Sequence, residues 1–173
     1  MNPPAVPPLP DYAQVDRSLR RGRQAYLALL PKAEQSPALH RIAPDPALRA
    51  TLLSSAAVLI QPRPGYAFVD VSVPCIVLAE WYYREGSALD LYLDLLHEFT
   101  HLRQLTEGLD LWDERFAYVD RPTEIEGYAV AVEEGMRLGM TEDDVLRHLA
   151  NPWMTSQDVA RLRQHIDERL ASG

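Results

Sequence analysis

The chain of 173 residues contains only one cysteine, Cys75. A single thiol cannot form an intrachain disulfide, and it excludes zinc sites that are built from several cysteines. Cys75 begins an apolar run, Cys75-Ile76-Val77-Leu78, in which we expect a buried and unreactive thiol. Disulfide scaffolds and Cys-rich metal centres are therefore not what organises this chain.

Basic clusters and long apolar segments are also scarce. The formal net charge is −8, and the one Arg-rich stretch, residues 17–23, is short, so we expect no nucleic-acid partner. No apolar stretch approaches the ~20 residues that span a bilayer, which argues against a membrane partner. The amino terminus, MNPPAVPPLP, has neither the basic start nor the apolar core of a signal peptide, and we expect a cytoplasmic protein. The sequence predicts no particular oligomeric state.

What remains is the composition of a folded domain, with 47% hydrophobic and 24% charged residues. We expect residues 1–11 to form a disordered, Pro-rich tail and residues 12–173 to form a single domain. Hydrophobic periodicity and turn residues predict an α+β fold, in which a small three-stranded antiparallel sheet precedes a mainly helical half. The predicted strands lie within residues 57–61, 66–73 and 75–83, and the predicted helices within 12–30, 44–55, 87–107, 122–138, 141–150 and 156–170.

His97-Glu98-Phe99-Thr100-His101 is an H-E-x-x-H sequence inside one of these helices. Residues four apart lie on one face of a helix, so both imidazoles can reach one ion. Glu98 projects beside that ion, where a water would sit, and zinc lowers the pKa of such a water toward ~7. The motif therefore supplies two ligands and a general base.

The alternative is a satisfied pair of core histidines, because a short motif also arises by chance. Apolar residues flank the motif on both sides, so the helix should be largely buried. Uncompensated histidines and a glutamate would be costly there, and coordination of a metal offsets that cost. We therefore favour one zinc ion per chain.

A catalytic zinc needs a third protein ligand, and the segment Pro122–Ala129 offers two glutamates. Glu126 borders the apolar stripe of its predicted helix, and we expect it to be the ligand. Glu124, on the opposite edge of the stripe, is its rival. His148 and His165 on later helices are further alternatives.

The motif, the glutamate 25 residues after His101 and the preceding strands together resemble the gluzincin group of zinc metallopeptidases, which includes thermolysin. The resemblance covers about residues 75 to 139 and implies a zincin-like fold. It implies that His97 and His101 are ligands, that Glu126 is the third ligand, and that Glu98 is the catalytic base. Gly127 departs from the family pattern, in which that glutamate usually precedes alanine.

These observations predict a zinc-dependent metallopeptidase that acts on a peptide or protein substrate. An extended substrate would pair with an exposed strand, for which Cys75–Trp81 is the candidate. Tyr118 and Tyr128 are candidates for stabilising an oxyanion, although packing alone would also explain them. A non-catalytic binding module with the same fold, and a zinc hydrolase that cleaves a non-peptide amide, remain the alternatives.

Overall fold

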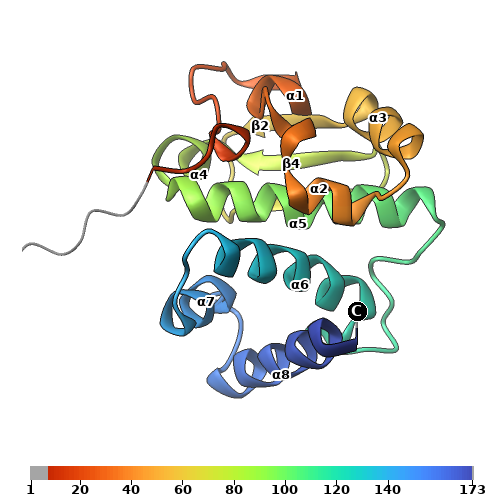
Figure 1. Cartoon of the computed structure of the whole chain (residues 1–173), viewed down its shortest axis with the longest axis vertical. Coiled ribbons are helices and arrows are strands. Elements are labelled where there is room, and N and C mark those ends of the chain that lie inside the picture. Colours follow the sequence, from red (N-terminus) through yellow and green to blue (C-terminus); the bar gives the residue numbers. More distant parts are fainter. Residues whose placement is uncertain (1–7, 173) are drawn as a thin grey trace, which may run out of the picture.

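Helix α5 lies between two layers of the molecule (Figure 1). The computed structural model describes residues 8–172. The strands are β1 (Gly22–Ala25), β2 (Ala57–Gln61), β3 (Ala67–Asp70) and β4 (Cys75–Ala79). The helices are α1 (Tyr26–Leu29), α2 (Pro37–Ile42), α3 (Pro46–Ser55), α4 (Glu80–Glu85), α5 (Ala88–Thr106), α6 (Pro122–Arg137), α7 (Glu142–Leu149) and α8 (Ser156–Ser172), with single 3-10 turns η1 (Asp11–Ala13), η2 (Ala33–Gln35) and η3 (Tyr118–Asp120). One layer contains the sheet and α1–α4, and the other contains α6, α7 and α8.

The α+β class is confirmed, but the sheet differs from the predicted one. It has four strands in the order β1-β2-β4-β3, and β2 runs parallel to β4. The chain passes from β2 to the outer edge, forms β3, and returns as β4 between them, which makes the central pair parallel. Every residue of β4 is buried, as expected for a central strand. The prediction of residues 75–81 as an exposed strand was therefore wrong, and β3 is an edge of the sheet.

The predicted helix over residues 12–30 was also wrong. Gly22 has a φ of 113°, outside the conformations of a right-handed helix, and it opens strand β1. Pairing of β1 with β2 satisfies backbone groups that a helix would have satisfied internally. The apolar residues that suggested a helix enter the core from a loop and from the short α1. Of the predicted tail, residues 1–7 lie outside the described residues, and Leu9 packs against the core.

The later helices were predicted close to their observed bounds, and the capping residues of α5 and α7 are explicit in the sequence. Ser87 caps α5, and Thr141 with Asp144 forms a capping box at α7. For α8 the cap is Thr155, not Ser156, since the Asp158 backbone donates to Thr155 Oγ1 at 3.1 Å. None of the helices within residues 8–172 is long and apolar enough to cross a bilayer.

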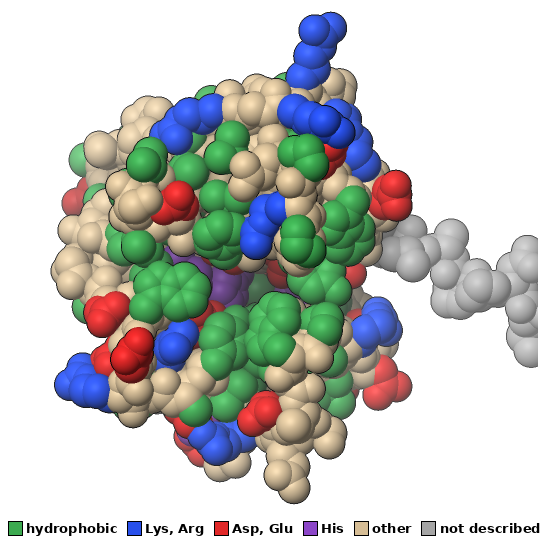
Figure 2. Space-filling model, turned by 180° about the vertical axis from the view of Figure 1, so that it is seen from behind, with side chains coloured by type: hydrophobic (Ala, Val, Ile, Leu, Met, Phe, Trp, Pro, Cys, Tyr) green, Lys and Arg blue, Asp and Glu red, His purple; other side chains and the backbone are tan. Residues whose placement is uncertain are grey.

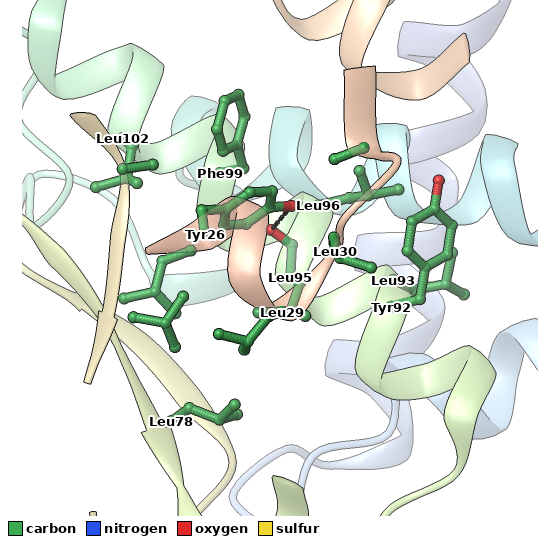
Figure 3. Packing of buried hydrophobic residues seen from close by; sticks show 14 of the residues in the cluster. Tyr26, Leu29, Leu30, Leu78, Tyr92, Leu93, Leu95, Leu96, Phe99 and Leu102 are labelled. Atoms are coloured by element: carbon green, nitrogen blue, oxygen red, sulfur yellow. Dashed lines mark hydrogen bonds between the residues drawn. The ribbon is translucent and has the colours of Figure 1, made fainter. Parts of the chain in front are cut away.

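The larger hydrophobic cluster fills the space between the sheet and α5 (Figure 3). Tyr26 and Phe99 pack with ring centroids 4.8 Å apart, and the Tyr26 hydroxyl donates to the Leu95 carbonyl at 3.2 Å. A second cluster joins α6 to α7 and α8. Helix α5 is thus held on one face by the sheet, and its opposite face meets α6.

Thr155→Ala should lower the free energy of unfolding by about 1 kcal/mol, because it removes the side-chain acceptor that caps α8. Ser156→Ala, one residue later, is the matched control and should change stability by only a few tenths of a kcal/mol. Urea denaturation of both variants tests this. A larger loss in Ser156→Ala would contradict the capping geometry.

Candidate metal centre

Three side chains of the H-E-x-x-H motif lie on the face of α5 that looks toward α6. His97, Glu98 and His101 are all buried, whereas Leu95, Leu96 and Phe99 on the other faces of the same turns join the hydrophobic core. The helical spacing predicted this arrangement, and the two imidazole rings lie edge to face with centroids 4.6 Å apart. The motif therefore presents polar groups at one boundary of an otherwise apolar helix.

Glu124 completes the cluster from the first turn of α6. Its Oε2 atom lies 3.3 Å from His97 Nε2 and 3.6 Å from His101 Nε2. One ligand atom from each of the three residues lies within 4.8 Å of the others, and all three side chains are buried. Two imidazole nitrogens and a carboxylate oxygen at this spacing could hold a metal ion.

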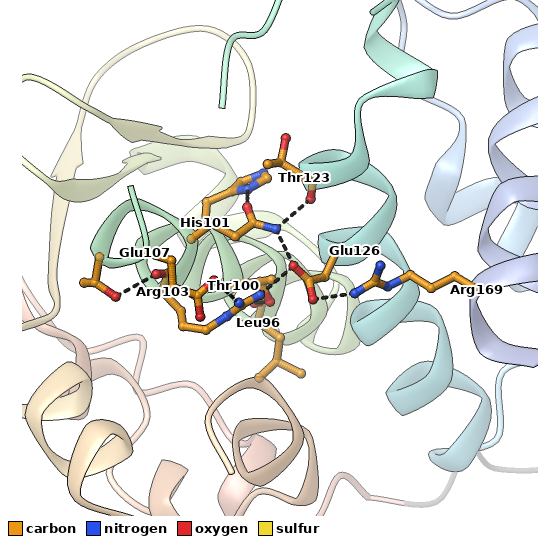
Figure 4. A network of polar contacts seen from close by, with 10 residues as sticks. Leu96, Thr100, His101, Arg103, Glu107, Thr123, Glu126 and Arg169 are labelled. Carbon is orange, nitrogen blue, oxygen red and sulfur yellow. Dashed lines mark hydrogen bonds and ion pairs between the residues drawn. The ribbon is translucent and has the colours of Figure 1, made fainter. Parts of the chain in front are cut away.

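Glu126, the ligand expected from the sequence, lies elsewhere. Its carboxylate pairs with Arg103 of α5 and Arg169 of α8, and it accepts a hydrogen bond from Gln104 Nε2 at 2.8 Å (Figure 4). The structure thus brings Glu124, not Glu126, to the two histidines. The rival glutamate takes the place that the sequence analysis gave to Glu126.

The reason is that α6 is buried on two faces. Its stripe of Ile125, Ala129 and Val132 packs against α8 in the second hydrophobic cluster. The face toward α5 consists instead of small residues at a spacing of four: Gly127, Ala131 and Gly135. Residues 124 and 126 are about 200° apart around a helix axis, so they cannot both reach the two histidines, and Glu126 meets Arg103 and Gln104 further along α5. The apolar stripe marks the side of α6 that packs against α8, so it did not identify the glutamate that lies beside the histidines.

The small residues allow close contact. A Cβ atom on Gly127 would lie 3.0 Å from two ring atoms of His97, too close for an undisturbed ring. The His97 ring also meets the Tyr128 ring, with ring centroids 4.3 Å apart. Gly127 and Tyr128 therefore fix the position of His97 by packing.

Hydrogen bonds fix His101 instead. Its Nδ1 atom lies 2.7 Å from Gln104 Oε1, while Gln104 Nε2 donates to Glu126 and to the Thr123 carbonyl. The amide orientation makes Oε1 the acceptor for an Nδ1 proton, which leaves the Nε2 lone pair directed toward Glu124. That is the tautomer a metal ligand needs, and an outer partner of this kind orients such a ligand. Glu126 thus acts on the centre through Gln104.

The charges of the cluster are strongly coupled. Burial lowers the pKa of His101, but its contact with Glu124 and the charges of Glu98 and Glu124 outweigh it and raise that pKa to about 9. Burial raises the pKa of Glu124, but its contacts with both histidines dominate and bring it well below its usual range. Burial also raises the pKa of Glu98. Without a metal, an imidazolium at His101 therefore neutralises Glu124.

Two adjoining cavities open onto the cluster, one of about 240 Å³ and one of about 450 Å³. His97 and Glu98 line both. The larger cavity has an apolar wall from β3 and from Leu111, Trp112 and Trp153. Figure 2 shows the corresponding hollow, with histidine side chains at its bottom and hydrophobic side chains around it. A substrate could therefore reach Glu98 from the surface.

The remaining candidates lie around the hollow. Tyr118 and Tyr128 both line the smaller cavity, and their hydroxyls are 2.9 Å apart. His148 contacts Asp90 and Asp94, and His165 contacts Asp120, so neither histidine joins the cluster.

Comparisons of the chain with family models, with curated proteins and with solved structures find no match.

Glu124→Gln should weaken zinc binding by more than the ~10- to 100-fold typical of an outer partner, because it removes a charged oxygen from the cluster. Glu126→Gln is the matched control and should have a smaller effect, since glutamine still offers an acceptor to Gln104. Competition with a chromophoric chelator measures both affinities. A larger loss in Glu126→Gln would restore the ligand assignment expected from the sequence.

Zinc binding should also release about one proton at pH 7, because His101 is protonated below about pH 9 in the metal-free protein and binds metal only as the neutral ring. The apparent zinc affinity should therefore rise about tenfold per pH unit between pH 6.5 and 8. Calorimetry in buffers of different ionisation enthalpy measures the proton release. His165→Gln should leave the slope unchanged, and a pH-independent affinity would contradict the protonated state of His101.

Proposed function

We propose that this protein is a zinc-dependent hydrolase of the metallopeptidase type, with His97, His101 and Glu124 as the zinc ligands. The observation that carries the proposal is the buried group of two imidazoles and one carboxylate beside Glu98. Two histidines with one glutamate are a ligand set of catalytic zinc sites, which leave a further position open. Zincin-like architecture is part of the proposal.

The buried polar atoms fit such an ion. Glu124 Oε2 and Glu98 Oε2 are buried and have no hydrogen-bond partner among the described residues. Buried acceptors without partners cost about 1–3 kcal/mol each, and a cation between the histidines and Glu124 would relieve that cost at Glu124. When bound, zinc supplies Lewis acidity that polarises a carbonyl and increases the acidity of water.

Glu98 then acts as the general base. It lines both cavities, and its unpartnered oxygen is available to take a proton from a water at the cluster. Burial raises its pKa, which makes the carboxylate a stronger base than an exposed glutamate. Glu98 later returns this proton to the leaving amine.

Strand β3 is the surface along which an extended peptide would bind. It pairs only with β4 within the described sheet, so its outer backbone groups are available for a further strand. Ala67, Phe68 and Val69 of β3 line the larger cavity together with Glu98. This geometry favours a peptide over a compact amide substrate, because the edge and Glu98 border one cavity.

Tyr118 is the side chain proposed to stabilise the oxyanion. Tyr128 packs on His97, and its hydroxyl also accepts a hydrogen bond from Asn151 Nδ2 at 2.9 Å, so its position is fixed by packing. Tyr118 lines both cavities, and its hydroxyl is hydrogen-bonded to that of Tyr128. A tyrosine hydroxyl held this way can donate to developing negative charge.

Glu98→Gln should leave zinc affinity and thermal stability nearly unchanged while lowering hydrolysis by ~10²–10⁴-fold, because the amide keeps the shape but cannot take a proton. Cleavage of a peptide library by the zinc-loaded protein, with mass-spectrometric detection, is the measurement.

Glu133→Gln, a partly buried position outside both cavities, serves as the control and should retain activity. Loss of zinc together with activity in Glu98→Gln would make Glu98 a ligand. If the zinc-loaded wild type cleaves no peptide, a binding module or a hydrolase of another amide takes the place of the proposed peptidase.

A further inference from the structure

A row of carboxylates leads along α5 to the catalytic cluster. Asp90, Asp94 and Glu98 are spaced by four, which places them on one face of the helix, and all three line the smaller cavity. Successive members are about 6 Å apart along the helix axis. The row therefore extends the floor of the cavity away from the zinc ligands.

His148 of α7 faces this row from the other layer. Its side chain is only 4% exposed, and its Nδ1 atom lies 3.0 Å from Asp90 Oδ1. The Nε2 atom lies 3.7 Å from Asp94 Oδ1 and has no hydrogen-bond partner among the described residues. A buried polar atom without a partner thus borders the cavity beside a carboxylate oxygen.

In this arrangement Asp94 has a carboxylate oxygen that is free to accept a hydrogen bond. Its Oδ2 atom accepts from the Tyr82 hydroxyl at 2.5 Å, whereas no hydrogen bond to Oδ1 occurs within residues 8–172. The Asp94 side chain is 26% exposed, and it is exposed where it lines the cavity. Oδ1 can therefore accept from a ligand.

Carboxylates outnumber the permanently charged cations in this cavity. Asp90, Asp94 and Glu98 line it together with two histidines and one arginine, Arg147, whose guanidinium is paired with Asp144. The rings of Tyr66 and Tyr82 form part of the wall, with centroids 5.1 Å apart. Aromatic faces and a carboxylate oxygen without a hydrogen bond, Asp94 Oδ1, together favour an organic cation.

Distance distinguishes two sources of that cation in a peptide. An α-ammonium nitrogen lies about 2.5 Å from the carbonyl carbon of its own residue. A lysine or arginine head group, on its flexible stem, lies about 6–7 Å from that carbon. Asp94 is displaced by about 6 Å along α5 from Glu98, which matches the longer reach.

We propose that the cavity lined by Asp90, Asp94 and His148 binds a lysine or arginine side chain of the substrate, next to the scissile bond at Glu98. The assignment of a peptide substrate rests on the function proposed above. Asp94 is the residue that determines specificity, and the contacts of His148 with Asp90 and Asp94 hold the two carboxylates in place.

The first test is a peptide series cleaved by the zinc-loaded full chain. Peptides differ only at the residues flanking the scissile bond, which are lysine, arginine, norleucine or glutamate. On one side of the bond, kcat/KM should be about tenfold higher or more for lysine or arginine than for norleucine. Asp94→Asn should largely remove this preference, and Asp143→Asn, an exposed change of equal charge on α7, should retain it.

The second test does not depend on hydrolysis. Titration with n-butylammonium, followed by NMR of the backbone amides of α5 and α7, should give saturable shifts with and without zinc. The neutral probe 1-butanol should give none, and Asp94→Asn should weaken the response to n-butylammonium while Asp143→Asn keeps it.

The two tests separate the failures. Binding of n-butylammonium through Asp94 without cleavage of any peptide would support the cation site and reject the peptidase. Cleavage without a basic preference and without amide shifts would overturn the cation site and leave the peptidase in place. A preference for a free amino terminus, equal for lysine and norleucine, would also overturn it.

Discussion

The contact between α5 and α6 is the constraint on which the rest of the structure depends. Helix α5 must be buried because one of its faces completes the core against the sheet, and this burial takes His97 and His101 out of water. Imidazoles without partners would destabilise such an interface. Glu124 supplies the opposite charge from α6. Gly127 lets the two helices approach closely enough for the Glu124 carboxylate to reach both rings. The same contact between α5 and α6 therefore satisfies both the charge pairing of the cluster and the packing of the helices.

The substrate hollow follows from the same docking. Because the cluster lies at the boundary between two layers, the walls above it come from segments far apart in the chain: β3, the loop that carries Trp112, α7, and Trp153. One cavity has carboxylates along α5, and the other has the apolar side chains of β3 and the loop. Glu98 lies where they meet. Because the environments on the two sides of Glu98 differ chemically, a substrate would bind in one orientation, with each half in the cavity that matches it.

The parts of this arrangement that are local in sequence could be predicted from sequence. The motif spacing fixes which side chains share a face of α5, and capping residues fix where α5 and α7 begin. Long-range choices could not be predicted in this way. Strand β1 forms because β2 offers it a partner, and β4 is central because the chain returns between β2 and β3. Glu124 and Glu126 look alike in the sequence because α6 is buried on two faces. The signal that distinguishes them is the row Gly127, Ala131 and Gly135, which marks the side of closest helix contact.

Each polar row of α5 has its partner in the other layer of the molecule. His97 and His101 meet Glu124 of α6, and Asp90 and Asp94 meet His148 of α7. The first pairing places imidazole rings of α5 against a carboxylate of α6, and the second places carboxylates of α5 against an imidazole of α7, so the C-terminal layer complements α5 at both points. Such complementarity specifies register as well as adding stability, because a shift of one helix turn would leave Glu124 facing a leucine in place of one of the two histidines. The second hydrophobic cluster stabilises α6 to α8 as a unit, and the two polar pairings, together with Val130 and Ala131 of α6 in the larger cluster, hold that unit on α5. The alignment of Glu98 with both cavities is a consequence of that fit.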